Sequence, residues 1–79
     1  MILETAQMEI TPGKVDDFLA ALPEGIKVLE EAEGFLGVSV HRGVERPEVV
    51  LLCIRWSTLE SHTIGFREGP LFAKWRAVI

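Results

Sequence analysis

The chain has 79 residues, with 12 acidic and 8 basic side chains, two histidines and one cysteine, and 48% of its positions are apolar. This length leaves room for one domain, whose core is so small that a disulfide, a metal or a partner subunit usually adds to its stability. The lone Cys53 excludes an internal disulfide, and no Cys/His cluster has structural-zinc spacing. We therefore expect a homo-oligomer, and a mean hydropathy of +0.26 favours the same interpretation.

Charge and hydropathy patterns argue against several classes of partner. The longest uninterrupted apolar run spans the six residues 49–54, far below the roughly 20 residues that cross a bilayer, so no membrane segment is expected. No secretory signal is visible at the N-terminus, which favours a reduced cytoplasmic location. A net charge of −4 repels phosphate backbones and anionic membranes, so nucleic acid and membrane surfaces are not expected partners.

The first third of the chain predicts a strand followed by a helix. Apolar and polar residues alternate over residues 2–10, broken only by Leu3 and Glu4, which is typical of a half-buried strand. Thr11 and Pro12 then supply an N-cap hydroxyl and a proline suited to the first helical position. Helical spacing of apolar residues continues to Leu29, with a kink or short break expected near Pro23 and Gly25.

Two further strands are expected in the middle of the chain. Gly34 is well placed to end the helix, because glycine adopts the left-handed conformation that follows many helix C-termini. Residues 35–42 and 48–56 form a predicted hairpin around the turn at 43–47. Alternate residues of 49–56 are apolar on both faces, so this strand needs cover on each side of the sheet.

The last part of the chain predicts a second helical region. Residues 57–60 (STLE) form a capping box, after which Leu59, His62, Thr63 and Phe66 share one helix face. Residues 69–70 (GP) interrupt the helix before a final stretch with an apolar stripe of Leu71, Phe72, Trp75 and Ile79.

The order of strand, helix, strand, strand and helix predicts an α+β fold, the ferredoxin-like split βαβ plait with an antiparallel sheet. The sixth element of that plait, a closing strand, does not follow in the given sequence. Either the sequence is cut short or this strand comes from elsewhere.

Several runs of residues resemble the sequences of one protein family. The run WSTLESHTIGFR (56–67), followed by LFAKW (71–75), resembles the second-helix region of the antibiotic biosynthesis monooxygenase (ABM) domain family. The strand that ends in TPG (11–13) and the helix that ends before GFLG (34–37) are also similar to that family. The resemblance covers essentially the whole of residues 1–79 as a single domain.

The resemblance implies a dimeric α+β barrel, in which two ferredoxin-like sheets pack face to face and each subunit holds a pocket between its sheet and helices. Members of the family are usually described as oxygenases that oxidise aromatic quinols or anthrones without flavin, haem or metal. Members commonly end in a further strand that carries a histidine. The haem-degrading branch differs at Ala6, Gly65 and Trp75, where it has asparagine, tryptophan and the haem-ligating histidine, so haem degradation is not expected.

The candidate site residues follow from the chemistry of such an oxidation, which needs a deprotonated, electron-rich substrate in an apolar pocket. His62 is the candidate catalytic base, since histidine changes charge near neutral pH. Arg67 is the candidate counter-charge for the substrate anion, and Phe66, Phe72 and Trp75 are candidates to hold a flat aromatic ring. No metal or cofactor is expected.

Two other functions remain open on the same residues. The lone histidine, with no acid in view to orient it, also suits a non-enzymatic dimer that binds a small hydrophobic or aromatic molecule. An isomerase or dehydratase could use His62 as its base without consuming oxygen. Each aromatic candidate also has a plain interpretation as a core residue, and Arg67 as a solvated charge at a helix end.

Overall fold

The computed structural model describes residues 1–78, without the side chain of Ile64, so the predicted apolar position Ile79 lies outside the described residues. Its elements in chain order are β1 (Ile2–Glu9), α1 (Val15–Glu30), β2 (Phe35–Arg42), β3 (Val49–Trp56), the π-helix η1 (Ser61–Phe66) and α2 (Leu71–Val78). The three strands form one sheet in the order β1-β3-β2, with both pairings antiparallel. The ferredoxin-like α+β fold is therefore confirmed.

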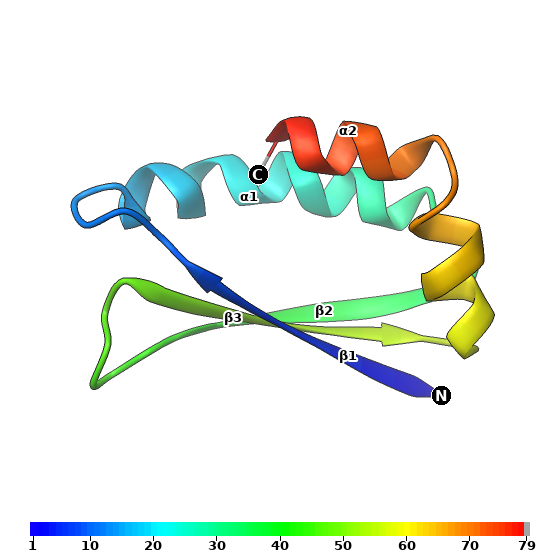
Figure 1. Cartoon of the computed structure of the whole chain (residues 1–79), viewed down its shortest axis with the longest axis horizontal. Coiled ribbons are helices and arrows are strands. Elements are labelled where there is room, and N and C mark those ends of the chain that lie inside the picture. The colour runs from blue at the N-terminus through cyan, green and yellow to red at the C-terminus, as the bar shows by residue number, and fades with distance from the viewer. Residues whose placement is uncertain (79) are drawn as a thin grey trace.

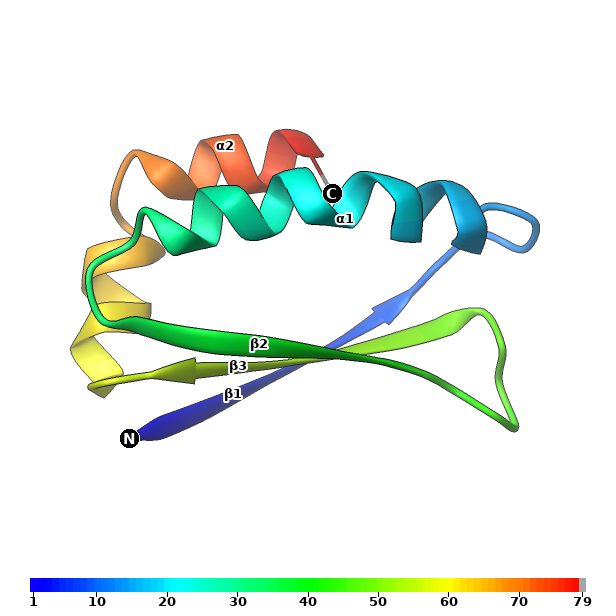
Figure 2. The same ribbon diagram turned by 180° about the vertical axis from the view of Figure 1, so that it is seen from behind.

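The two α-helices cover the same face of the sheet and leave the other face bare, as opposite views of the chain show (Figures 1 and 2). Strand β3 pairs along its whole length with β1 on one side, and with β2 on the other, where Leu36 forms a bulge. Among the described strands, β1 and β2 are therefore the sheet edges, and β1 is the edge beside the site described below.

The core lies between β3 and the helices. The side chains of β3 that face the helices are almost fully buried, as the alternation of that strand predicts: Val50, Leu52, Ile54 and Trp56. Leu22 and Leu29 of α1, Phe66 of η1 and Trp75 of α2 pack onto them. Trp56 lies at the centre of this core, with an exposed fraction of 0%.

Helix α1 differs from the prediction at its start and in its middle. It begins at Val15, and no side chain caps its N-terminus; the Thr11 carbonyl instead accepts from the Lys14 N–H in a turn, 2.9 Å. The expected break is wrong, because α1 continues through Pro23 as one helix. Burial of Leu22 and Leu29 on either side of the proline offsets its missing hydrogen bond. No helix in the described part of the chain is long and apolar enough to span a membrane.

Gly34 fixes the junction between α1 and the start of the second helical region. Its φ of +86° confirms the predicted left-handed conformation. Its carbonyl accepts from the Ser57 N–H at 2.8 Å, and a Cβ on Gly34 would collide with the side chains of Ser57 and Ser61. Glycine is therefore needed both for the backbone conformation and for the close approach of these two segments.

The predicted capping box at 57–60 is wrong in its details. The cap is Thr58, whose Oγ1 accepts from the Ser61 N–H at 3.1 Å. The turns that follow are π-helical, which places more residues in each turn than an α-helix does. Leu59, which was expected to share a helix face with His62, is 52% exposed, whereas the His62 side chain is 18% exposed.

Candidate functional site

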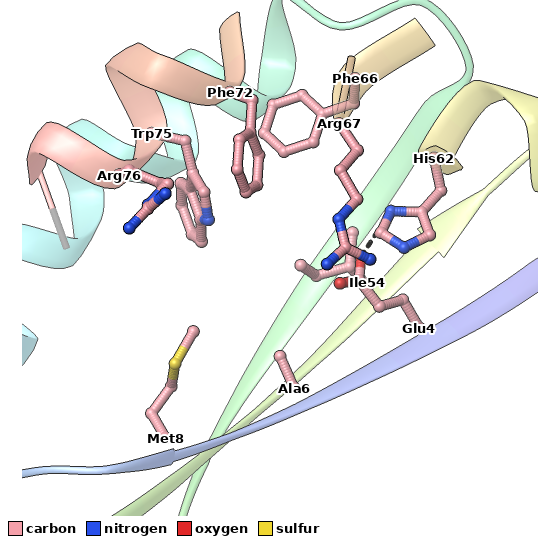
Figure 3. A pocket seen from close by; sticks show the side chains of 10 residues that line it. All are labelled: Glu4, Ala6, Met8, Ile54, His62, Phe66, Arg67, Phe72, Trp75 and Arg76. Carbon is pink, nitrogen blue, oxygen red and sulfur yellow. Dashed lines mark ion pairs between the residues drawn. The ribbon is translucent and has the colours of Figure 1, made fainter. Parts of the chain in front are cut away.

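A cavity of about 310 Å³ opens between the edge strand β1 and the segment formed by η1 and α2 (Figure 3). Its volume is at the low end of ligand pockets, which run from roughly 300 to 1,000 Å³. Ten residues line it: Glu4, Ala6, Met8, Ile54, His62, Phe66, Arg67, Phe72, Trp75 and Arg76.

The floor of the pocket comes from the sheet. Residues Glu4, Ala6 and Met8 stand two positions apart on β1, so the strand pleat directs all three to the face beneath the helices. Ile54 lies beside them, because it pairs with Glu4 in the antiparallel register. Except for Glu4, this floor is apolar.

The π-helix η1 supplies the end wall. The Arg67 N–H donates to the His62 carbonyl at 3.0 Å. This hydrogen bond spans five residues, as in a π-helix, whereas the corresponding bond of an α-helix spans four. His62 and Phe66 both line the cavity from this element, and Arg67 extends into it from the residue that follows (Figure 3). Such π-turns are frequent at functional sites.

His62 is held beside a carboxylate. Its Nδ1 lies 3.2 Å from Oε1 of Glu4, and the two side chains are only 18% and 26% exposed. The same Oε1 accepts the indole N–H of Trp56 at 3.0 Å, which fixes the carboxylate in place. The histidine Nδ1 is buried without a hydrogen bond, so its contact with Glu4 has the distance of an ion pair but not hydrogen-bond alignment.

This arrangement has a chemical consequence for the imidazole. Nδ1 faces the acceptor-only carboxylate of Glu4, so the pair suits a ring whose Nδ1 carries the hydrogen. The other ring nitrogen, Nε2, is then the one that could accept a proton from a ligand. His62 thus combines a candidate base nitrogen with a carboxylate that lies beside the ring.

An aromatic cluster closes the pocket on the helix side. Phe66 contacts Trp56, Phe72 and Trp75, with ring centroids 5.4, 5.7 and 6.5 Å apart. Phe66 and Trp75 are 3% and 5% exposed, so both belong to the core and present only part of their rings to the cavity. Phe72 is half-buried and has more of its ring available.

Two arginines complete the lining. Arg67 lies near His62, whereas Arg76 lies on the far side of Phe72 and Trp75 from it (Figure 3). The guanidinium carbon of Arg76 is 5.9 Å from the centroid of the Phe72 ring, a cation–π contact. Among the described residues, the ion pairs are made by Arg42, Arg46 and His62, and neither pocket arginine takes part in one.

The structure brings all five sequence-predicted site residues to this one cavity: His62, Phe66, Arg67, Phe72 and Trp75. The expectation that no acid orients His62 is wrong, because Glu4 does so from a strand 58 residues away in the sequence. The signal for Glu4 was its place in β1, where a carboxylate interrupts the alternation on the inward-facing side. Arg76 was also missed, since charged residues beside a helical stripe are usually solvated.

No three His, Cys, Asp or Glu side chains lie together as a possible metal site in residues 1–78 as described. The charged groups that the cavity offers to a ligand are therefore those of Glu4, His62, Arg67 and Arg76.

The fold and the cavity define the class as small ferredoxin-like α+β proteins with a pocket between the sheet edge and the second helical region. The sequence profile of the antibiotic biosynthesis monooxygenase family matches residues 1–78, and the chain belongs to this family.

Individual relatives agree with this assignment. A crystal structure of a Bordetella bronchiseptica protein named for the same family is 31% identical, with a TM-score of 0.93 over 98% of this chain and 79% of that chain. A protein of Chloroflexus aurantiacus, also named for the family, is 27% identical, with a TM-score of 0.70 over 95% of this chain and 71% of that chain. YczJ of Bacillus subtilis, described as uncharacterised, is 29% identical over 79 residues, all of this chain and 83% of YczJ.

Proposed function

We propose that the protein is a cofactor-independent monooxygenase that oxidises a small phenol- or quinol-like aromatic substrate in this pocket. The observation that carries the proposal is the position of His62, whose imidazole lines an aromatic-walled cavity while its Nδ1 faces the anchored carboxylate of Glu4. Membership of the antibiotic biosynthesis monooxygenase family supports the same reaction class.

The proposed reaction balances without an added reductant. His62 Nε2 takes a proton from the substrate hydroxyl, and the resulting anion transfers one electron to dioxygen. The substrate radical and superoxide combine into a peroxide on a ring carbon. When the hydroxyl is that of an enol whose keto form has CH₂ at that carbon, as in an anthrone, the carbon that bears the peroxide keeps one hydrogen. Loss of water from the peroxide then leaves a carbonyl, so overall CH₂ and O₂ become C=O and H₂O. The substrate supplies all four electrons, and the proton on His62 returns to the departing hydroxide.

The other pocket residues have supporting roles in this proposal. Arg67 provides positive charge near the substrate oxyanion, where a preorganised cation lowers the energy of the deprotonated form. The half-buried ring of Phe72 and the part of the Trp75 ring that lines the cavity hold the flat substrate above the apolar floor formed by Ala6 and Met8.

Replacing His62 with alanine is the direct test. We expect the oxidation rate, measured as oxygen uptake with a panel of anthrones and naphthoquinols, to fall by about 100- to 10,000-fold, the usual contribution of a general base. Lys74→Ala is the control, because Lys74 is exposed on α2 and lies outside both the cavity lining and the sheet. Equal rates for wild type and His62→Ala would remove His62 from the mechanism.

The same experiment separates the alternatives. Ligand binding measured by calorimetry without any oxygen uptake would favour a non-enzymatic binding module. Substrate turnover that depends on His62 but consumes no oxygen would favour an isomerase or dehydratase.

The proposal includes a homodimer formed through the bare sheet faces. The middle strand β3 presents Val49, Leu51 and Cys53 to that face, and no described element covers them (Figure 2). Leu3 on β1 faces the same way and is 56% exposed. A sheet with one uncovered apolar centre is stabilised when a second sheet packs on it.

Sedimentation equilibrium should report twice the 8.8 kDa chain mass at micromolar concentration. Leu51→Glu should shift the protein towards the monomer, because it places a charge at the centre of the contact. Val44→Glu is the control, since Val44 lies in the β2–β3 turn and is 86% exposed. An 8.8 kDa wild-type particle would contradict the proposed dimer.

A further inference from the structure

The pocket carries a second polar feature that the oxidation does not use. Arg76 lines the cavity from α2, at the end away from His62 and Glu4 (Figure 3). In the mechanism above, the base and the counter-charge are His62 and Arg67, both from the η1 region. Arg76 has no task in that chemistry.

The surroundings of Arg76 prepare it for an anion. Its guanidinium carbon lies 5.9 Å from the centroid of the Phe72 ring, which orients the side chain along the aromatic wall. None of the ion pairs in the described part of the chain involves it. An arginine that rests against an aromatic ring and has no carboxylate partner keeps its N–H groups free for a ligand anion.

The negative net charge of the whole chain contrasts with the two arginines that line the cavity. The protein has a net charge of −4, yet the cavity lining holds two arginines against one glutamate, whose Oε1 already accepts from Trp56 and lies beside His62. With His62 neutral, the charged side chains that line the cavity therefore include one more positive than negative group, in a protein whose net charge is negative. Its volume of about 310 Å³ suits one or two rings.

We propose that the ligand of this pocket is an aromatic hydroxy acid of one or two rings, whose carboxylate is bound by Arg76 while its hydroxyl lies towards His62. The planar guanidinium matches a carboxylate in shape and charge. The aromatic rings would lie between these ends, against Phe72 and Trp75. The inference rests on the proposed site and names its substrate class, but it requires binding alone and no oxidation.

A matched pair of probes tests the carboxylate. 6-Hydroxy-2-naphthoate carries a hydroxyl and a carboxylate at opposite ends of two rings, and 6-hydroxy-2-naphthamide has the same shape without the charge. In calorimetric titrations, wild type should bind the acid about 10-fold more tightly than the amide, as expected for a charge-assisted contact. Equal affinity for the two probes, or no binding of either, would overturn the proposal.

Variants on one helix then assign the effect to Arg76. Arg76→Gln should abolish the preference for the acid and change amide binding by less than about twofold. Arg76→Lys should retain part of the preference. Lys74→Gln is the control, because it removes the same charge from the exposed side of α2, outside the cavity lining. A similar loss in Lys74→Gln, or an equal loss of acid and amide binding in Arg76→Gln, would contradict a carboxylate contact.

Oxygen uptake measured in parallel keeps the two proposals distinguishable. Acid-selective binding without oxygen uptake would support the ligand class while the monooxygenase proposal fails. Oxidation of neutral quinols without any preference for binding the acid would support the monooxygenase proposal and contradict the proposed ligand class.

Discussion

Replacing Glu4 with glutamine should lower kcat for the proposed oxidation by at least about 10-fold and leave KM nearly unchanged. The amide of the new side chain keeps an oxygen that can accept the Trp56 N–H, so the fold and the cavity persist. It lacks the carboxylate charge that lies 3.2 Å from His62 Nδ1 and would face the positive charge formed on the ring during proton transfer. In a serine-protease triad the same acid-to-amide change costs about 10⁴-fold, and the unaligned contact here predicts a smaller loss.

The double variant distinguishes positioning from general damage. If Glu4 acts through His62, then Glu4→Gln should cause no further loss in a His62→Ala background. Glu24→Gln is the control, since Glu24 is exposed on α1 and lies outside the cavity lining and the sheet. Additive losses in the double variant, or an unchanged kcat in Glu4→Gln, would contradict the positioning role.

The largest effect on stability is expected for Trp56→Ala, which should lower the free energy of unfolding by about 3–5 kcal/mol. Trp56 is 0% exposed and ends the central strand. Its ring contacts Phe35, His62 and Phe66, with centroids 5.9, 5.6 and 5.4 Å away. The substitution leaves a cavity at the junction of the sheet and η1, and the Glu4 carboxylate loses its indole partner.

Urea unfolding at a fixed protein concentration measures this loss, because the stability of a dimer depends on concentration. Trp56→Phe keeps most of the packing and should lie between wild type and Trp56→Ala. Leu59→Ala is the control, since Leu59 is 52% exposed and its loss should change stability by less than about 0.5 kcal/mol. A loss below about 1.5 kcal/mol for Trp56→Ala would show that this ring is not central to the core.

The helical regions contain features that the sequence pattern alone does not predict. Thr11 and Pro12 have the composition of a helix start, but α1 begins at Val15 because Gly13 adopts a φ of +86° in the intervening turn. Pro23 has the composition of a break, but tertiary burial of its neighbours keeps α1 continuous. The π-turn at η1 adds a residue to a helical turn without a compositional signal.

The sequence alone predicted only some of the residues of the candidate site. The sequence places His62 and Phe66 on one helix face and Phe72 and Trp75 on another, and the chemistry implied by the family resemblance adds Arg67. The spacing alone does not show that these residues line one cavity. Glu4 and Arg76 come from opposite ends of the chain, and no local pattern relates residues so far apart.

The sequence by itself determined the local elements: alternation fixed the faces of β1 and β3, and Gly34 marked the turn between α1 and β2. These features depend on residue spacing and backbone conformation, which near neighbours control. Only the tertiary structure decided that a carboxylate on the first strand meets His62 and that Arg76 reaches the far end of the same cavity. Such contacts depend on how the sheet and helices pack, and that packing is an interaction of the whole chain.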